Sequence, residues 1–242
     1  MATEPARERF VRWHLEELLV KQPGLRLVSG PAGWVRLAGV LAFAADAPAR
    51  EQIADEYHIE IDVPDSFPEQ LPTVKETQGR IAADFHKLED GSLCLGSPTR
   101  LLLIARASVT LPRFVDRCVV PYLYGHSYFE KYRTMPFGEL EHGAAGIRND
   151  FASLFGVGDP RAVAEFVRLT SMRRREANKQ RCPCGSRRRL GRCHNRRVND
   201  LRRRLGRRWF RMWHVAFRAR WADTNPTVSP PPQLVDTADA HV

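Results

Sequence analysis

Alternation of apolar and polar residues is clearest between Tyr57 and Val63, where apolar side chains occupy every second position. This two-residue period predicts a β-strand with one buried face. Pro64, Pro68 and Pro72 follow. Because proline cannot donate a hydrogen bond to a β-ladder, we expect the chain to leave the sheet after Val63.

The same patterns predict three more strands and an N-terminal helix. Residues 4–21 place apolar side chains at spacings of three and four, which is typical of an amphipathic helix, and Pro23-Gly24 ends the pattern. Apolar stretches bounded by Gly, Pro and Asp predict the strands Leu25–Ser29, Trp34–Ala44 and Thr73–Gln78. A helix followed by a four-stranded antiparallel meander is therefore expected, and the fold class is α+β.

Helical periodicity returns in the second half of the chain. It predicts a helix over Ser108–Tyr124, where Pro121 disturbs the end, and a second helix over Arg161–Lys179. Residues 125–149 are rich in aromatic residues, glycine and histidine, and a packed loop is expected there. Residues 223–242 show no periodicity and are expected to be disordered.

These elements suggest an organisation in four parts. We expect a domain over residues 1–150, a helical linker over 151–180, a small helical region over 181–222 and a disordered tail over 223–242. A chain of 242 residues with 43% hydrophobic content can bury one ordinary core and still carry such an appendage.

Charge is divided unevenly along the chain. Residues 168–220 contain twenty Lys and Arg against Glu176 and Asp200, a net charge of +18. The other residues must carry −8 to reach the formal total of +10. Two regions of opposite charge therefore share one chain.

The cysteines and the N-terminal segment bear on location. Five cysteines is an odd number, and three of them lie within twelve residues at a spacing typical of metal ligands, which argues against a disulfide framework. The N-terminal segment lacks the apolar core of a signal peptide, and the longest apolar run, Leu37–Ala45, is too short to span a bilayer. We expect a cytoplasmic protein.

Cys94 stands in the run Gly91-Ser-Leu-Cys94-Leu-Gly96, after the strand and the proline-rich turn. A reactive cysteine needs partial exposure and neighbours that favour its thiolate, and an irregular segment beside glycine permits exposure. The alternative is a small buried residue between Leu93 and Leu95. Cys118 is interpreted in that second way, because it falls on the apolar stripe of the predicted helix.

The order of strand, Phe-Pro, a second proline, a histidine and Gly-x-Leu-Cys-Leu resembles the ubiquitin-conjugating enzyme family over residues 8–125, in a bacterial form. The resemblance implies that Cys94 accepts the carboxyl end of a ubiquitin-like protein as a thioester from an activating enzyme. It also implies transfer of that acyl group to an amine. The family has His-Pro-Asn upstream of the cysteine, whereas this chain has Phe85-His86-Lys87-Leu88, so the oxyanion-stabilising Asn is absent.

Three histidines are candidates for the missing function. His86, His126 and His142 can each donate a hydrogen bond or move a proton near neutral pH. Flanking glycines around His142 would let the backbone approach a substrate. A structural histidine is the alternative for each of them, and the family has a histidine at His86 for reasons of fold.

Cys182, Cys184, Cys193 and His194 have the spacing C-x-C-x₈-C-H, which supplies three thiolates and one imidazole for a tetrahedral zinc ion. Four protein ligands leave no open position, so a structural Zn²⁺ is expected. Cys-Pro-Cys-Gly-Ser closed by Cys-His is similar to the SEC-C motif found at the end of the SecA translocation motor and in many bacterial proteins. The alternative is a chance ordering of four unrelated residues.

Arginine runs surround this motif, and they are followed by Trp209, Phe210, Trp213, Phe217 and Trp221. The last four of these aromatic residues share one face of a predicted helix, which leaves arginines on the other faces. Such arginines suit a polyanionic partner, either nucleic acid, an acidic protein or an anionic membrane. The alternative is a solvated basic face without a dedicated partner.

Two hypotheses of function follow. The first is a ubiquitin-conjugating-like cysteine acyltransferase with Cys94 as nucleophile and a structural zinc. Relatives of this type occur beside antiphage defence enzymes that make cyclic oligonucleotides, which makes a nucleotidyltransferase a candidate target by analogy. The second is a non-catalytic module whose zinc and arginine region binds nucleic acid or an acidic protein; the absent Asn favours it.

Overall fold

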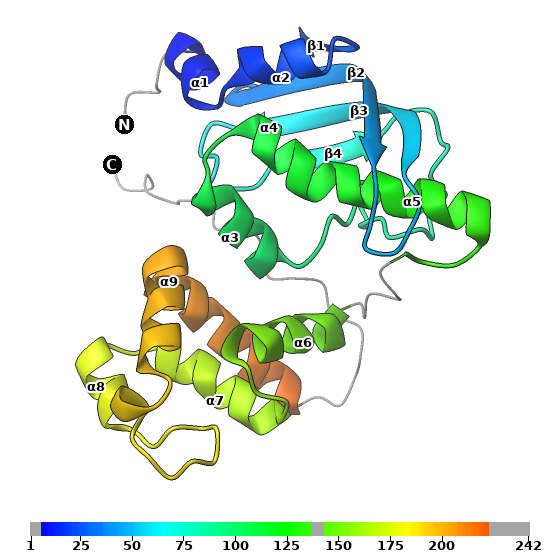
Figure 1. The fold of residues 1–242 in the computed structure, drawn as a ribbon. Helices are drawn as coiled ribbons and strands as arrows, with labels where there is room; N and C mark the ends of the chain where they lie inside the picture. The colour runs from blue at the N-terminus through cyan, green and yellow to red at the C-terminus, as the bar shows by residue number, and fades with distance from the viewer. Residues whose placement is uncertain (1–5, 137–142, 223–242) are drawn as a thin grey trace. The chain divides into compact units, whose positions relative to one another are not determined.

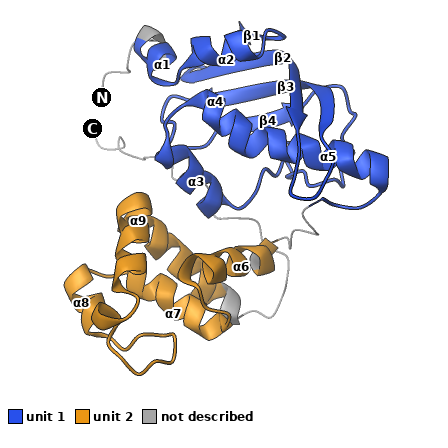
Figure 2. Cartoon of the chain, in the orientation of Figure 1, with its two compact units in different colours: residues 1–139, 234–242 blue, residues 140–233 orange. Residues whose placement is uncertain are grey.

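The computed structural model of the chain describes residues 6–136 and 143–222 (Figure 1). The chain divides near residue 140 into two compact units (Figure 2). This boundary lies before the predicted one at residue 150. Residues 151–180 are also not a linker, because Phe151, Phe155 and Phe166 are buried in the core of the second unit.

The first unit begins with two short helices instead of the single helix predicted over residues 4–21. Helix α1 spans Ala6–Arg12 and α2 spans Leu15–Lys21. His14 between them has a φ of 54°, in the left-handed region, which interrupts the helical hydrogen bonds. The break buries Trp13 completely, and the carbonyl oxygen of Trp13 accepts the N–H of Leu111 at 2.9 Å.

A four-stranded antiparallel sheet follows, with strands in the order β1-β2-β3-β4. This confirms the α+β class and the four-stranded sheet. The strands are β1 (Leu25–Val28), β2 (Trp34–Ala45), β3 (Ile53–Pro64) and β4 (Thr73–Glu76). The pairing places apolar residues on one face, where Leu37 lies opposite Ile61 and Ile61 opposite Val74, all three without solvent exposure.

Glycine is required at position 39, in the middle of β2, where Gly39 pairs with Leu25 of β1. Gly39 has a φ of +135°, and a Cβ atom on it would stand 2.1 Å from the carbonyl oxygen of Gly24. That carbonyl oxygen accepts the N–H of Val40 at 3.0 Å. The close approach holds the residue before β1 against the middle of β2.

After the sheet the chain forms α3 (Pro98–Ala107), then α4 (Leu111–Phe114), a π-helical turn η1 (Val115–Val119) and α5 (Val120–Tyr132). Helix α3 was not predicted. The predicted end of this helix at Tyr124 was wrong, because the helix continues past Pro121 to Tyr132. Proline removes one N–H from the helical ladder, and the π turn directly before it accommodates that loss.

Two helices replace the loop predicted over residues 125–149. Residues 125–132 belong to α5, and α6 (Gly143–Phe155) begins the second unit. Residues 137–142 lie outside the described part of the chain.

The second unit is helical in its described residues. It comprises α6, α7 (Pro160–Ser171), α8 (Arg174–Lys179), a 3-10 turn η2 (Leu190–Arg192) and α9 (Asn195–Ala222). The helix predicted over 161–179 is divided, because Arg173 has extended backbone angles between α7 and α8. Gly206, with a φ of 78°, kinks α9.

The core of the second unit is aromatic, and its fully buried members come from α6, α7 and α9: Phe151, Phe155, Phe166, Phe210 and Trp213. The rings of Phe155 and Phe166 stack at 5.0 Å. The predicted aromatic face of the last helix is confirmed at Phe210, Trp213 and Phe217, which are buried. The side chain of Trp221 lies outside the described residues.

Candidate functional site

Cys94 lies in the loop between β4 and α3, and this loop is tied to the sheet. The backbone N–H of Cys94 donates to the carbonyl oxygen of His86 at 2.8 Å, and the N–H of Leu93 donates to the carbonyl oxygen of Val74 at 2.7 Å. Lys87 and Leu93 pair as a short antiparallel bridge. The cysteine is therefore held on a fixed backbone directly beside the sheet.

The thiol of Cys94 is half-buried, which leaves it the partial exposure that a reactive cysteine needs. Burial raises its pKa, and a hydrogen bond from the N–H of Gly96 opposes the shift only in part. A reactive cysteine needs neighbours that favour its thiolate, and the surroundings of Cys94 favour the protonated thiol instead. At neutral pH the resting thiol is protonated.

Tyr122 on α5 reaches the same loop, a contact that the sequence did not predict. Its hydroxyl donates to the carbonyl oxygens of Phe85 and His86 at 3.0 and 3.3 Å. Burial raises the pKa of Tyr122, and the neighbouring Cys94 raises it further. A tyrosine one helical turn after Cys118 was the available signal, but only the tertiary structure brings it to Cys94.

The three candidate histidines occupy different places. His86 is in the Cys94 loop, with a φ of 42°, and its carbonyl oxygen accepts from both Cys94 and Tyr122. His126 is buried on α5. His142 lies outside the described residues, so its predicted role stays a prediction.

His126 belongs to a buried polar network. Its Nδ1 atom is 2.7 Å from the hydroxyl of Tyr57, which is also 2.8 Å from the hydroxyl of Ser127. Ser127 donates to Asp55 at 2.7 Å. Burial lowers the pKa of His126, with the carboxylate of Glu130 opposing the shift, so the imidazole is neutral at neutral pH.

Arg80 holds the outer side of this network. It donates to Asp55 and to Glu130 at 2.6 Å each, and its guanidinium lies 4.2 Å from the centre of the Tyr57 ring. Burial would raise the pKa of Asp55, but hydrogen bonds from Arg80 and Ser127 lower it to about 2. The carboxylate is therefore charged at every physiological pH.

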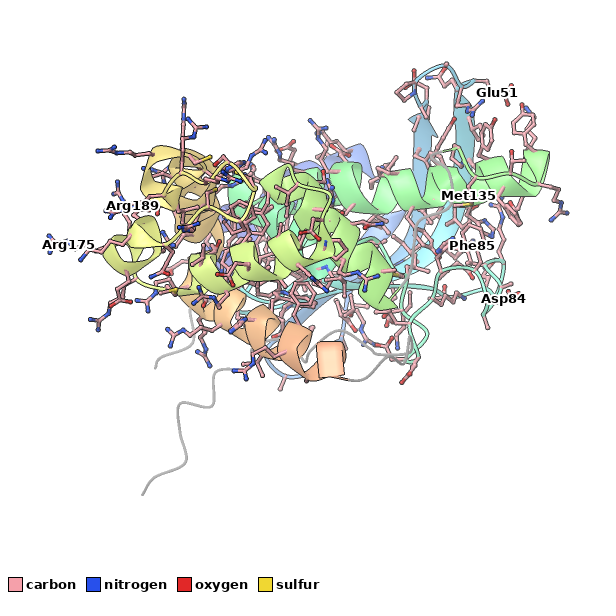
Figure 3. All side chains as sticks on the ribbon, turned by 90° about the horizontal axis from the view of Figure 1, so that it is seen from below. Glu51, Asp84, Phe85, Met135, Arg175 and Arg189 are labelled. Carbon is pink, nitrogen blue, oxygen red and sulfur yellow. The ribbon has the colours of Figure 1, made fainter. Side chains whose placement is uncertain are left out.

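A pocket of about 300 Å³ opens beside this network. Phe85 forms part of its wall, and the Phe85 ring lies 4.7 Å from the His126 ring, centre to centre. Figure 3 labels Asp84 and Phe85 at this place. The lining residues are Arg80, Ala82, Asp84, Phe85, His126, Phe129, Glu130 and Arg133. Because Phe85 directly precedes His86, the pocket wall and the Cys94 loop share one segment.

Cys118 is buried on the helix, as its position on the apolar stripe predicted. Burial raises the pKa of its thiol to about 12. The side chain serves the core and does not take part in thiolate chemistry.

The second unit brings the four predicted metal ligands together. The ligand atoms of Cys182, Cys184, Cys193 and His194 all lie within 4.8 Å of one another. The Sγ atom of Cys184 is 3.4 Å from that of Cys182 and 3.6 Å from that of Cys193. In a tetrahedral site with zinc–sulfur bonds of about 2.3 Å, two sulfur atoms lie slightly less than about 4 Å apart. The observed sulfur–sulfur distances are close to this value, so the cluster fits one metal ion.

A short turn creates this cluster. Arg181 and Arg189 pair as an antiparallel bridge, and the N–H of Cys182 donates to the carbonyl oxygen of Arg188 at 2.8 Å. Gly185, with a φ of 78°, allows the chain to reverse between these residues. The first two cysteines thus face Cys193 and His194 at the start of α9.

Part of the arginine content has a structural use that the sequence did not reveal. Arg197 donates to the carbonyl oxygen of Phe155 at 2.9 Å, at the end of α6. Arg202 donates to the carbonyl oxygens of Leu169 and Thr170 at 2.9 and 3.0 Å, at the end of α7. Guanidinium groups at these helix ends satisfy backbone acceptors and complement the helix dipoles.

Neither a protein-family model nor a curated protein nor a solved structure matches this chain. Within the described ranges, no helix combines the length and the apolar character needed to cross a membrane.

Proposed function

We propose that this protein is a ubiquitin-conjugating-like acyl carrier whose nucleophile is Cys94. The observation that carries the proposal is the place of Cys94: half-buried, on a loop hydrogen-bonded to His86, between a four-stranded antiparallel meander and a helix. The order of helices, meander, cysteine loop and helices is the one that the family resemblance implies. The proposed modifier is a ubiquitin-like protein or a peptide carboxyl group.

The chemistry is two acyl transfers. The Cys94 thiolate attacks the acyl carbon of a thioester on the activating enzyme, whose own thiolate leaves. An amine of the target then attacks the new thioester, an amide forms, the Cys94 thiolate leaves and one proton is released. No redox cofactor takes part. The proposed target is a protein amine, with a nucleotidyltransferase of antiphage defence as the candidate that the analogy offers.

The raised pKa of Cys94 gives this mechanism a requirement. A thiol must lose its proton before it attacks, and the resting site favours the protonated form. We propose that His86, the histidine on the Cys94 loop, accepts that proton when a partner docks. Tyr122 acts as a positioning residue, because its hydroxyl fixes the backbone of the segment that carries His86.

The metal cluster is proposed to hold a structural Zn²⁺. Three thiolates and an imidazole within 4.8 Å fill a tetrahedral site and leave no position for a substrate. Burial opposes ionisation of Cys184, but hydrogen bonds from Ser186 outweigh it and lower its pKa to about 7. Burial raises the pKa of the neighbouring Cys182 to about 12, so binding of the metal has to release the proton of that thiol.

A second candidate function is a non-catalytic binding module on the same fold. The specific observation that favours it is again the pKa of Cys94, which burial raises above the ordinary value. A scaffold needs no thiolate, and in that case the loop would serve recognition alone.

Mass spectrometry separates the two candidates. The full chain is purified together with the proteins encoded beside it, and Cys94→Ser is used because an oxygen ester resists aminolysis better than a thioester. We expect an acyl adduct on residue 94 that hydroxylamine removes from the wild type. Cys94→Ala should lose both the adduct and transfer, while Cys118→Ala, which changes a cysteine of the core, should keep the adduct. Equal transfer by wild type and Cys94→Ala would reject the carrier and leave the module.

A further inference from the structure

Two groups among the described arginines of the second unit differ in their contacts. Arg197, Arg202 and Arg207 cap helices, and Arg203 pairs with Asp200. The other group is exposed on α8 and on the turn that precedes η2, and its members make no ion pair with a described carboxylate: Arg173, Arg174, Arg175, Arg181, Arg187 and Arg189. We call this second group the arginine edge.

The edge is held in a fixed arrangement. The N–H of Leu190 donates to the carbonyl oxygen of Gln180 at 2.8 Å, which closes the turn that carries Arg187 and Arg189. The metal ligands Cys182 and Cys184 lie inside the same turn. The arginine side chains therefore project from a preorganised backbone, and an anion that binds them does not have to order the chain first.

Two features of the turn are unfavourable in the free protein. Arg181 and Arg189 face each other directly across the bridge, and like charges in that position repel. Arg187 has a φ of 60°, a left-handed conformation that only a few per cent of non-glycine residues adopt. A bound polyanion would relieve the first of these costs.

The surroundings of the edge indicate the kind of anion. Protein interfaces and membrane-binding surfaces use exposed aromatic or aliphatic anchors. Among the described residues of the second unit, the exposed large hydrophobic side chain is Val215, far along α9. Figure 3 shows the labelled side chains of Arg175 and Arg189 extending away from the ribbon at the same end of the unit. Guanidinium forks without apolar anchors match phosphate oxygens.

We propose that the arginine edge binds the phosphate backbone of nucleic acid, with the metal-ligand turn as its rigid support. Contacts to phosphates carry no sequence information, so binding should be independent of sequence. This property is separate from the acyl chemistry of Cys94 and does not depend on it. DNA and RNA present the same phosphate group, and the experiment distinguishes them.

The test is fluorescence anisotropy of the full chain with a 20-base-pair DNA duplex, an RNA duplex of the same sequence, and a single strand of each. The edge variant combines Arg175→Gln, Arg187→Gln and Arg189→Gln. The matched control removes the same charge elsewhere on the unit, through Arg161→Gln, Arg211→Gln and Arg218→Gln, all at exposed positions. Circular dichroism and metal content should be unchanged in both variants.

We expect the edge variant to bind at least tenfold more weakly at 0.1 M salt and the control to change by less than threefold. The negative slope of log K against log salt should become shallower by about 3 in the edge variant on DNA. Three phosphate contacts are lost, and each contributes about 0.9 to the slope. Equal weakening in both variants would show an effect of net charge only and reject the edge. Binding to polyglutamate or to anionic vesicles without binding to any nucleic acid would also overturn the proposal.

Discussion

The hydroxyl of Tyr122 donates to the carbonyl oxygen of His86, and the same carbonyl oxygen accepts the backbone N–H of Cys94. One backbone carbonyl oxygen thus connects helix α5 to the cysteine loop through two hydrogen bonds. The reactivity of Cys94 should depend on these two hydrogen bonds.

Tyr122→Phe is expected to loosen the loop and to increase the alkylation rate of Cys94 several-fold, because the hydroxyl that fixes Phe85 and His86 is lost. Stability should fall by about 1 kcal/mol, the ordinary contribution of a hydrogen bond. Tyr124→Phe is the control, since its hydroxyl donates to the carbonyl oxygen of Glu51 at 3.0 Å, outside the loop. Iodoacetamide labelling followed by peptide mass spectrometry measures the rate. Equal rates in the two variants would show that Tyr122 does not position the site.

Asp55 should make the first unit sensitive to acid. Its pKa is lowered from 3.8 to about 2 by Arg80 and Ser127 against the effect of burial. A carboxylate with a lowered pKa stabilises the fold above the unfolded pKa, so its contribution of about 2 kcal/mol is lost as pH falls from about 4 to about 2. Asp55→Asn should lose this stability at neutral pH and show a flatter pH profile. Urea titrations across that pH range measure the free energy of unfolding of both proteins. A pH profile of Asp55→Asn that runs parallel to that of the wild type would contradict this role of Asp55.

One zinc ion per chain is expected in protein prepared without chelator. Cys184→Ala should lose it, because three ligands remain and the turn is no longer closed. Cys94→Ala is the matched control and should retain the metal. Elemental analysis gives the stoichiometry, and circular dichroism after chelation should show loss of helix from the second unit. Protein that contains no metal and keeps its helices would argue against a structural site.

The capping role of Arg202 can be tested by comparing two single substitutions. Arg202→Gln should lower the free energy of unfolding by about 1–3 kcal/mol, since the carbonyl oxygens of Leu169 and Thr170 lose a charged donor. The neighbouring Arg203→Gln should change it by less than about 0.5 kcal/mol, as the Arg203 side chain is 75% exposed. Thermal and urea unfolding compare the two. Equal effects would mean that the arginines act through charge alone.

Local sequence determined the elements whose pattern is short and repetitive. The alternation from Tyr57 to Val63 predicted β3 because a strand with one buried face needs that period. The strand begins earlier, at Ile53, and ends at Pro64, one residue beyond the predicted end. The spacing of Cys182, Cys184, Cys193 and His194 predicted the ligand cluster. Ligands that lie so near one another in the sequence can meet through a single turn.

Tertiary structure decided what local pattern leaves open. The break at His14 follows from burying Trp13 against the rest of the unit, and the helix passes Pro121 because a π turn absorbs the missing N–H. The environment of Cys94 depends on Tyr122, 28 positions away in sequence, and the motif gave no indication that burial would raise the pKa of the thiol. Such contacts arise from packing between distant segments, and no window of sequence contains both partners.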